Sequence, residues 1–252
     1  MHILLERQGI SSFAKNNSEE GESLLFGRKR HMRMRKKKWA DGWLEAHSDY
    51  VFSDPKEYAG RWRDLLNAGI LHVEIGTGKG DYINHMAAMY PEEGWVGIEK
   101  DRSAIAVAAR KAVEDENDDL HNKRLIVNDA ENLLSWFAPG EIDIIHLNFS
   151  DPWPKKHYHK RRLSSSRFLT MYRELLSQDG YIRMKTDNKD LFEASVLYFL
   201  ENGFTLTEFS VDYRRKDHPE DAVTEYESRF LELGQPIYQL CAKPLRDDKI
   251  EP

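Results

Sequence analysis

The chain has 252 residues, of which 40% are hydrophobic and 32% are charged, and its formal net charge is -6. This composition suits one sizeable globular domain and excludes a wholly disordered protein. The single cysteine, Cys241, excludes an internal disulfide, and no Cys/His spacing indicates a metal site. No apolar run has the length of a membrane span or a signal peptide, so we expect a cytoplasmic protein without a membrane partner.

The N-terminal region is polar and then strongly basic. Residues 1–31 show no sustained apolar period, which predicts a disordered or non-native tail. A basic run, RKRHMRMRKKK, covers Arg28 to Lys38. We therefore expect a single globular domain over residues 32–252 that begins with a basic segment. The local positive charge of this segment suits binding of a polyanion.

The first predicted helix lies in the segment SDPKEYAGRWRDLL. Asp54 suits its N-cap and Pro55 its first turn. The apolar residues on one face of this helix are Tyr58, Trp62, Leu65 and Leu66. The pattern predicts a helix that packs against the main sheet.

From Ile70 onward, short apolar runs alternate with helical patterns. The runs are LHVEIG, WVGIE, LIVND, IDIIHLNFS and YIRMKTD, and the helical patterns lie near residues 81–90, 101–114, 131–137 and 165–178. This alternation predicts βαβ units in a doubly wound, Rossmann-like α/β domain with helices on both faces of the sheet. After a helix at 189–201, TLTEFSVD and PIYQLCAKP follow with no clear helix crossover between them, which predicts a mostly parallel, seven-stranded sheet with an antiparallel final strand.

A glycine-rich turn follows the first of these strands. VEIGTGKGDY places Glu74 near the strand end and Gly76 and Gly78 in the turn before a helix. Glycine lets the backbone approach a ligand, and the helix N-terminus offers unpaired N–H groups. The GxGxG spacing matches neither the dinucleotide fingerprint nor the P-loop, so NAD and ATP become less favoured ligands.

Two acidic residues follow the next strands. Glu99 ends WVGIE and is suited to accept hydrogen bonds from a ribose diol. Asp129 ends LIVND and either caps a helix or reaches an adenine edge. Because ligands of such sheets bind beyond the carboxyl ends of the strands, the combination predicts a site for an adenosine-bearing ligand.

The run NFSDPWPKKHYHKRRL combines one carboxylate with many basic side chains. Asp151 either forms a turn before Pro152 or faces a ligand, and Trp153 either packs or stacks on a base. The residues that follow suit a sugar-phosphate track, although a solvated charge run is the alternative. They are His157, Tyr158, His159, Lys160, Arg161 and Arg162.

The sequence resembles the bacterial tRNA (guanine-N7)-methyltransferase family. The motifs that carry the resemblance are MRMRKKKWAD, VEIGTGKGDY, GIEKDRSAI, LNFSDPWPKKHYHKRRL, KTDN and TEYESRFLELGQPIY, which span Met32 to about Tyr238. The resemblance implies a class I methyltransferase fold, S-adenosyl-L-methionine as cofactor and methylation of the guanine at position 46 in the variable loop of tRNA. It is compatible with a monomer or a homodimer.

The resemblance also implies roles for individual residues. It assigns Glu74, Glu99, Asp129 and Asp151 to the cofactor pocket, with Asp151 as the catalytic candidate. It assigns to the substrate Lys155, Asp187, Thr224, Glu225, Tyr226 and Glu227. The sequence alone leaves another interpretation open, because Thr224 and Glu227 form a capping box and Asp187 is placed to cap the following helix.

Two other functions are compatible with parts of the sequence. DPWP is loosely similar to the Asn/Asp-Pro-Pro-aromatic motif of enzymes that methylate amino groups, but Trp153 separates the two prolines. A non-catalytic RNA-binding module is the second alternative, and the intact glycine turn with Glu74 and Glu99 argues against it.

The residues before Met32 precede the start that is common in the family. Because they show no core pattern, we expect a truncated chain that begins at Met32 to keep most of the methyltransferase activity. Methyl transfer to tRNA by the truncated and full-length chains measures this directly. Loss of most of the activity would show that the tail contributes to function.

Overall fold

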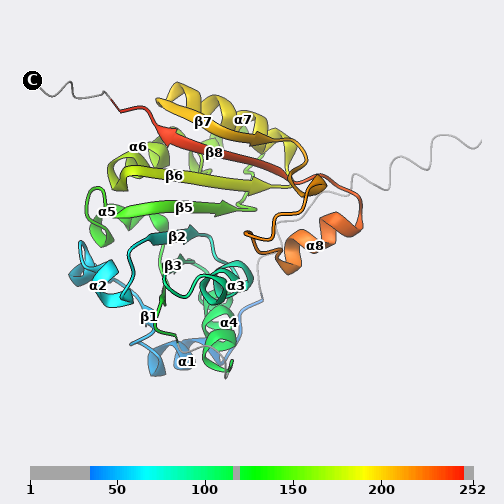
Figure 1. Cartoon of the computed structure of the whole chain (residues 1–252). Coiled ribbons are helices and arrows are strands. Elements are labelled where there is room, and N and C mark those ends of the chain that lie inside the picture. The colour runs from blue at the N-terminus through cyan, green and yellow to red at the C-terminus, as the bar shows by residue number, and fades with distance from the viewer. Residues whose placement is uncertain (1–34, 116–119, 247–252) are drawn as a thin grey trace, which may run out of the picture. The chain divides into compact units, whose positions relative to one another are not determined.

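The computed structural model describes residues 35–115 and 120–246, so the tail predicted for residues 1–31 lies outside it. The described residues form an eight-stranded sheet with the strand order β1-β4-β3-β2-β5-β6-β8-β7 (Figure 1). Its strands are β1 Val51–Phe52, β2 Leu71–Ile75, β3 Gly94–Ile98, β4 Lys123–Ile126, β5 Ile142–Asn148, β6 Leu176–Thr186, β7 Phe204–Ser210 and β8 Tyr238–Pro244.

The directions of the strands agree with the prediction. The strands from β1 to β6 pair in parallel, and β8 runs antiparallel to both β6 and β7. The mostly parallel sheet with an antiparallel final strand is therefore confirmed. The predicted number of seven strands misses β1, whose two residues are too few to show a period.

Helices cover both faces of the sheet. They are α1 Ala40–Ala46, α2 Trp62–Leu66, α3 Asp81–Met89, α4 Arg102–Val113, α5 Leu133–Trp136, α6 Ser166–Leu175, α7 Lys189–Glu201 and α8 Glu225–Glu232. One core contains apolar residues of α2, α5, α6 and α7, and a second contains those of α1, α3 and α4. Because side chains alternate along a strand, Val96 of β3 joins the first core and Trp95 the second.

The segment after β1 differs from the predicted helix. It forms a 3-10 turn, Lys56–Tyr58, and the helix α2 begins only at Trp62. Gly60 lies between them with φ of +78°, a conformation that interrupts a right-handed helix. Asp54 is not a cap, because Pro55 holds the N-cap position without a side-chain cap, and Asp54 Oδ1 instead accepts a hydrogen bond from Trp136 Nε1 at 2.9 Å.

The carboxyl ends of the parallel strands converge on one edge of the sheet. The glycine turn follows β2, Glu99 follows β3, Asp129 lies just beyond β4, Asp151 beyond β5, and Asp187 directly follows β6. Parallel pairing of these strands brings segments that are far apart in the sequence to this edge.

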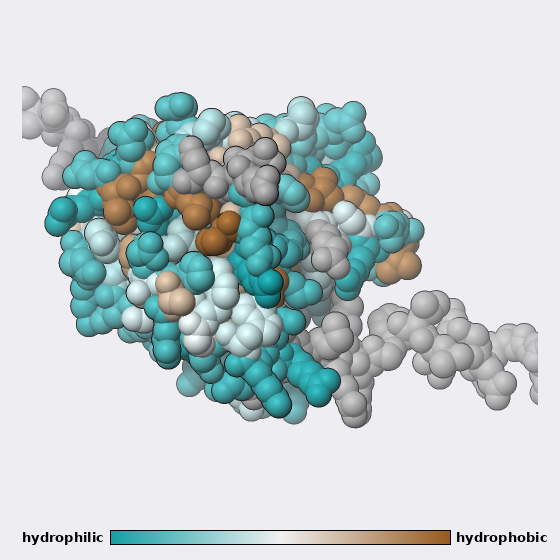
Figure 2. Space-filling view, turned by 90° about the horizontal axis from the view of Figure 1, so that it is seen from below, coloured by the Kyte–Doolittle hydropathy of each residue, from teal (hydrophilic) through white to brown (hydrophobic). Residues whose placement is uncertain are grey.

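The surface is largely hydrophilic on the face that Figure 2 shows, where hydrophobic side chains form only smaller groups. Within the described part of the chain, no helix is long and apolar enough to cross a membrane.

Candidate active site

A cavity at the carboxyl edge of the sheet brings together four of the predicted cofactor residues. Gly76, Glu99, Asp129 and Asp151 line it, each from the end of a different strand. Its apolar lining consists of Ile75, Ile98, Ala130, Phe149, Trp153 and Leu163. The cavity therefore combines apolar surface, which can pack against an aromatic ring, with carboxylates that can accept hydrogen bonds.

The glycine turn is held against the strand ends by backbone contacts. The Gly76 N–H donates to the Ile98 carbonyl oxygen at 2.8 Å, and φ of Gly76 is +84°. At Gly80, φ is +79° and an added Cβ would lie 2.6 Å from the Ala108 Cβ. Glycine is thus required at Gly80 both for the backbone conformation and for the close approach to α4.

The Glu99 carboxylate joins two neighbouring loops. It accepts hydrogen bonds from the Gly78 N–H at 3.1 Å and from the Asp101 N–H at 2.8 Å. Burial raises the pKa of Glu99, although these two hydrogen bonds oppose the shift. Each carboxylate oxygen has a further lone pair, so Glu99 remains able to accept hydrogen bonds from a ligand in the cavity.

Glu74 is buried and does not line the cavity. Its carboxylate accepts hydrogen bonds from Thr77 Oγ1 at 2.5 Å and from Asn148 Nδ2 at 3.0 Å, and burial raises its pKa. Asn148 Oδ1 is also buried and accepts no hydrogen bond from any described residue. Sequence analysis missed Asn148, although it lies in the motif that carries Asp151.

Asp129 caps a short turn and also lines the cavity. Its Oδ1 accepts a hydrogen bond from the Glu131 N–H at 3.1 Å, which caps a short 3-10 turn over Ala130–Asn132. The same residue is exposed and lines the cavity.

The loop that carries Asp151 has an unusual backbone. Phe149 and Trp153 have φ values of +49° and +40°, which non-glycine residues adopt at a cost of about 1–3 kcal/mol each. Arg162 Nε donates to the Pro152 carbonyl oxygen at 2.7 Å, and its Nη2 lies 3.1 Å from His159 Nε2. These contacts hold the loop in place.

Arg162 was expected to belong to the sugar-phosphate track, but it is buried in the structure. Only 4% of its surface is exposed, so the structure does not offer this guanidinium to RNA phosphates. Its position and its contact with the Pro152 carbonyl instead indicate that it supports the loop.

The other residues of the predicted track, and Lys155 before it, lie at or near the surface. Lys155, His157, Lys160 and Arg161 are exposed, and Tyr158 and His159 are half-buried. The Arg161 guanidinium carbon lies 5.1 Å from the ring centroid of Trp153 and 4.9 Å from that of Tyr158. Trp153 therefore packs against Arg161 while also lining the cavity.

The start of α8 lies beside the Asp151 loop. The ring centroids of Tyr226 and Phe149 are 5.2 Å apart. Burial, followed by the negative charges of Asp187 and Asp151, raises the pKa of Tyr226 to about 12. Three of the predicted substrate and catalytic residues therefore interact electrostatically, although they come from different parts of the chain.

The helix caps resolve part of the ambiguity that the sequence left. Thr224 Oγ1 accepts a hydrogen bond from the Glu227 N–H at 3.0 Å and so caps α8, which begins at Glu225. Glu227 is fully buried, and its carboxylate pairs with Lys185 and Arg214. Asn188, not Asp187, caps α7, so capping does not account for Asp187.

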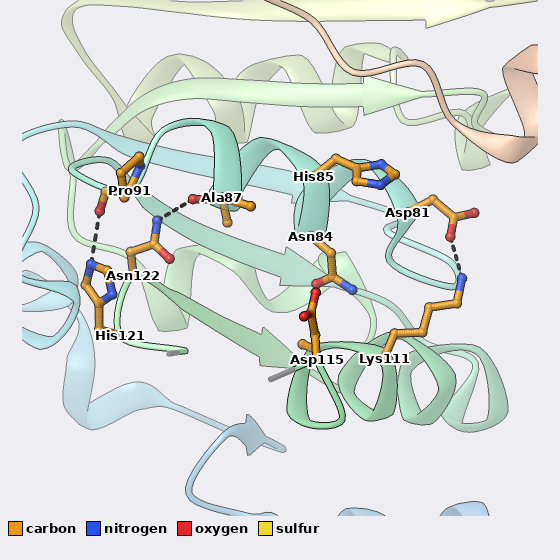
Figure 3. Close-up of a pocket in the computed structure, with 11 residues that line it drawn as sticks. Asp81, Asn84, His85, Ala87, Pro91, Lys111, Asp115, His121 and Asn122 are labelled. Carbon is orange, nitrogen blue, oxygen red and sulfur yellow. Dashed lines mark hydrogen bonds and ion pairs between the residues drawn. The ribbon is translucent and has the colours of Figure 1, made fainter. Parts of the chain in front are cut away.

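A second cavity lies between α3 and α4, away from the predicted site residues (Figure 3). Asp81 and Lys111 form an ion pair there, and His121 Nε2 lies 3.0 Å from the Pro91 carbonyl oxygen. None of the sequence-predicted cofactor or substrate residues lines this cavity. Because four of the predicted cofactor residues line the first cavity, we assign the site to it.

A doubly wound sheet with a glycine turn and acidic residues at successive strand ends is typical of class I methyltransferases. In agreement, a family model described as "Putative methyltransferase" matches residues 68–240. The chain belongs to the tRNA (guanine-N(7)-)-methyltransferase family. It is 46% identical over 209 residues to the member from Bacillus velezensis, and this match covers 82% of this chain and 95% of that protein. The member from Listeria innocua is 44% identical over 217 residues, 86% of this chain and 100% of that protein.

Solved structures support the fold. A structure described as an antibiotic related methyltransferase has a TM-score of 0.54 and 16% identity, and the match covers 71% of this chain and 89% of that one. The 16S rRNA (adenine(1408)-N(1))-methyltransferase from Catenulisporales acidiphilia has a TM-score of 0.53 and 14% identity, over 78% of this chain and 94% of that one. At these identities the similarity concerns the class I methyltransferase fold alone.

Proposed function

We infer that this protein methylates N7 of a guanine in tRNA with S-adenosyl-L-methionine as methyl donor, at position 46 of the variable loop. The observation that carries this inference is the cavity at the carboxyl edge, where Gly76, Glu99, Asp129 and Asp151 meet. Its support from relatives is the 44% identity to the Bacillus subtilis tRNA (guanine-N(7)-)-methyltransferase over 82% of this chain.

The residues of the site fit S-adenosyl-L-methionine. Glu99 is placed to accept hydrogen bonds from ribose hydroxyls, and Asp129 from the adenine amino group. Glu74 and Asn148 are buried and do not line the cavity, so no contact with the cofactor is assigned to them. The cofactor supplies a methyl group already activated by the positive sulfonium.

The chemistry at N7 requires positioning more than a base. N7 of guanine has an in-plane lone pair and no hydrogen, so no proton must leave before attack. Holding N7 in line with the methyl carbon is then the main task. Because positive charge moves from the cofactor to the purine, the Asp151 carboxylate at the cavity can stabilise the cationic ring as it forms.

The other predicted residues would hold the tRNA. We propose that Tyr226 and Asp187, next to Asp151, contact the guanine edge, and that Lys155 binds near it. The exposed His157, Lys160 and Arg161 extend this surface toward the phosphates. We further propose that the enzyme acts in the cytoplasm as a monomer or a homodimer.

Transfer of labelled methyl from S-adenosyl-L-methionine to unmodified tRNA tests the proposed function. We expect the label in N7-methylguanosine after digestion of the tRNA to nucleosides, and a tRNA with adenosine in place of guanosine at position 46 should accept none. Label in N6-methyladenosine would instead support the amino-methyltransferase alternative. Binding of tRNA without any methyl transfer would support the non-catalytic alternative.

A further inference from the structure

A cluster of buried charges lies between the sheet and α8. Lys185 of β6 and Glu227 of α8 are fully buried, and Asp221 is 3% exposed. Lys185 Nζ lies 2.6 Å from Asp221 Oδ2 and 3.3 Å from Glu227 Oε2. Arg214 also belongs to the cluster, with its Nη2 2.6 Å from Asp221 Oδ2 and its Nε 2.6 Å from Glu227 Oε1.

The cluster pairs Lys185 and Arg214 with Asp221 and Glu227, and Arg183 adds a third cation, with its Nη1 3.5 Å from Asp221 Oδ1. Burial of a charge is strongly unfavourable unless the charge is paired and hydrogen-bonded. Lys185 holds the pKa of Asp221 below its usual range despite burial, with help from Arg183 and Arg214. The segment between Arg214 and Glu227 can therefore leave the sheet only by separating these ions, which fixes its position.

A row of hydrogen bonds ties the cluster to the centre of the sheet. Tyr82 of α3 donates its hydroxyl hydrogen to Asp221 Oδ1 at 2.9 Å. His146 Nδ1 lies 3.2 Å from the Tyr82 hydroxyl oxygen, and His146 Nε2 lies 2.9 Å from His72 Nδ1.

His146 lies in the middle of this row. Burial holds the pKa of His146 well below its usual range, so the ring is neutral and has a single N–H. The donor and acceptor roles along the row depend on the histidine tautomers, and His72 Nε2 lies 2.9 Å from Glu93 Oε2 at its other end. Tyr82 thus connects β2 and β5 to the Asp221 carboxylate.

The same segment carries the residues that face the Asp151 loop. Glu227 is held in the cluster by its side chain, and its N–H is bound by Thr224 Oγ1 at 3.0 Å. Tyr226 adjoins Glu227, packs on Phe149 and interacts with the charges of Asp151 and Asp187. A change in the cluster would therefore shift the Tyr226 ring relative to Asp151.

We propose that Tyr82, Lys185 and Asp221 are positioning residues for the methyl transfer. They hold the segment from Arg214 to Glu227 so that the Tyr226 ring keeps its position beside Asp151 and Asp187. None of the three lines the cofactor cavity. This inference rests on the proposed function, because it assigns a role to the guanine-binding side of that site.

The variant Tyr82→Phe tests the proposal with the smallest change, because it removes one hydroxyl group and no charge. We expect kcat/KM for tRNA to fall about tenfold while the Kd for S-adenosyl-L-methionine changes by less than about twofold. Hydrogen exchange of the backbone amides in the first turn of α8 should become faster. The matched control is Tyr172→Phe, since Tyr172 is also fully buried, lies in α6 and makes no hydroxyl hydrogen bond to a described residue.

The outcomes separate the possible failures. An unchanged kcat/KM for tRNA in Tyr82→Phe, measured well below its melting temperature, would overturn the positioning role even if the variant is less stable. A loss of kcat/KM without faster exchange in α8, or with an equal loss of cofactor affinity, would overturn it as well. If the wild-type protein forms no N7-methylguanosine, the proposed function itself fails. In that case the exchange measurement still reports whether Tyr82 holds the segment.

Discussion

Replacement of Asp151 by alanine is expected to lower kcat by about a hundredfold or more, because removing one preorganised electrostatic contact at a reacting centre typically has an effect of this size. Asp151 lines the cavity with Glu99 and Asp129 and lies close enough to affect the pKa of Tyr226. Single-turnover methyl transfer at saturating cofactor and tRNA measures the effect on the chemical step.

The variant Asp151→Asn separates two roles of the carboxylate. Asparagine keeps an acceptor oxygen but removes the negative charge. If Asp151 stabilises the cationic guanine by its charge, the rate of Asp151→Asn should be nearly as low as that of Asp151→Ala. If Asp151 only orients the guanine or the cofactor through a hydrogen bond, Asn should keep much of the rate.

Asp129→Ala is the matched control, since Asp129 is a carboxylate that lines the same cavity. We expect it to raise the Kd for the cofactor and to leave kcat at saturation nearly unchanged. An Asp151→Ala variant that behaves in the same way, with only a weaker cofactor affinity, would contradict the catalytic assignment.

The sheet and the cofactor edge could be predicted because they depend on local patterns. Runs such as LHVEIG have the length and composition of buried parallel strands, and the strand that carries Glu74 is fully buried in the structure. The carboxyl edge then follows from the topology, which is why Glu99, Asp129 and Asp151 were assigned correctly to one edge. The interrupted helix at Gly60 was missed, because apolar spacing does not report a positive φ.

The burial of individual charged residues could not be predicted. Lys185 lies in a strand and Glu227 lies in a T-x-x-E pattern. Lysine and glutamate side chains are usually exposed. Their burial depends on Arg214 and Asp221, which lie 29 and 36 residues from Lys185 along the chain. Only the tertiary structure shows that these charges meet.

The two adjacent arginines in KKHYHKRRL show the same limit and lead to a second large expected effect. Arg161 is exposed and Arg162 is 4% exposed, so one sequence pattern contains two environments. We expect Arg162→Ala to lower kcat/KM for tRNA by about tenfold to a hundredfold. The Pro152 carbonyl would lose its donor at 2.7 Å, and the backbone strain at Trp153 would no longer be opposed.

The salt dependence of tRNA binding distinguishes the two arginines. A side chain that neutralises a phosphate contributes about one unit to the slope of log K against log salt concentration. Arg161→Ala should therefore weaken tRNA binding and reduce this slope by about one, whereas Arg162→Ala should leave the slope unchanged. Arg162→Lys should recover part of the rate, because lysine can still donate to the Pro152 carbonyl but cannot also reach His159. An equal reduction of the slope by both alanine variants would show that Arg162 contacts RNA after the loop rearranges, and that its support of the Asp151 loop is not its main role.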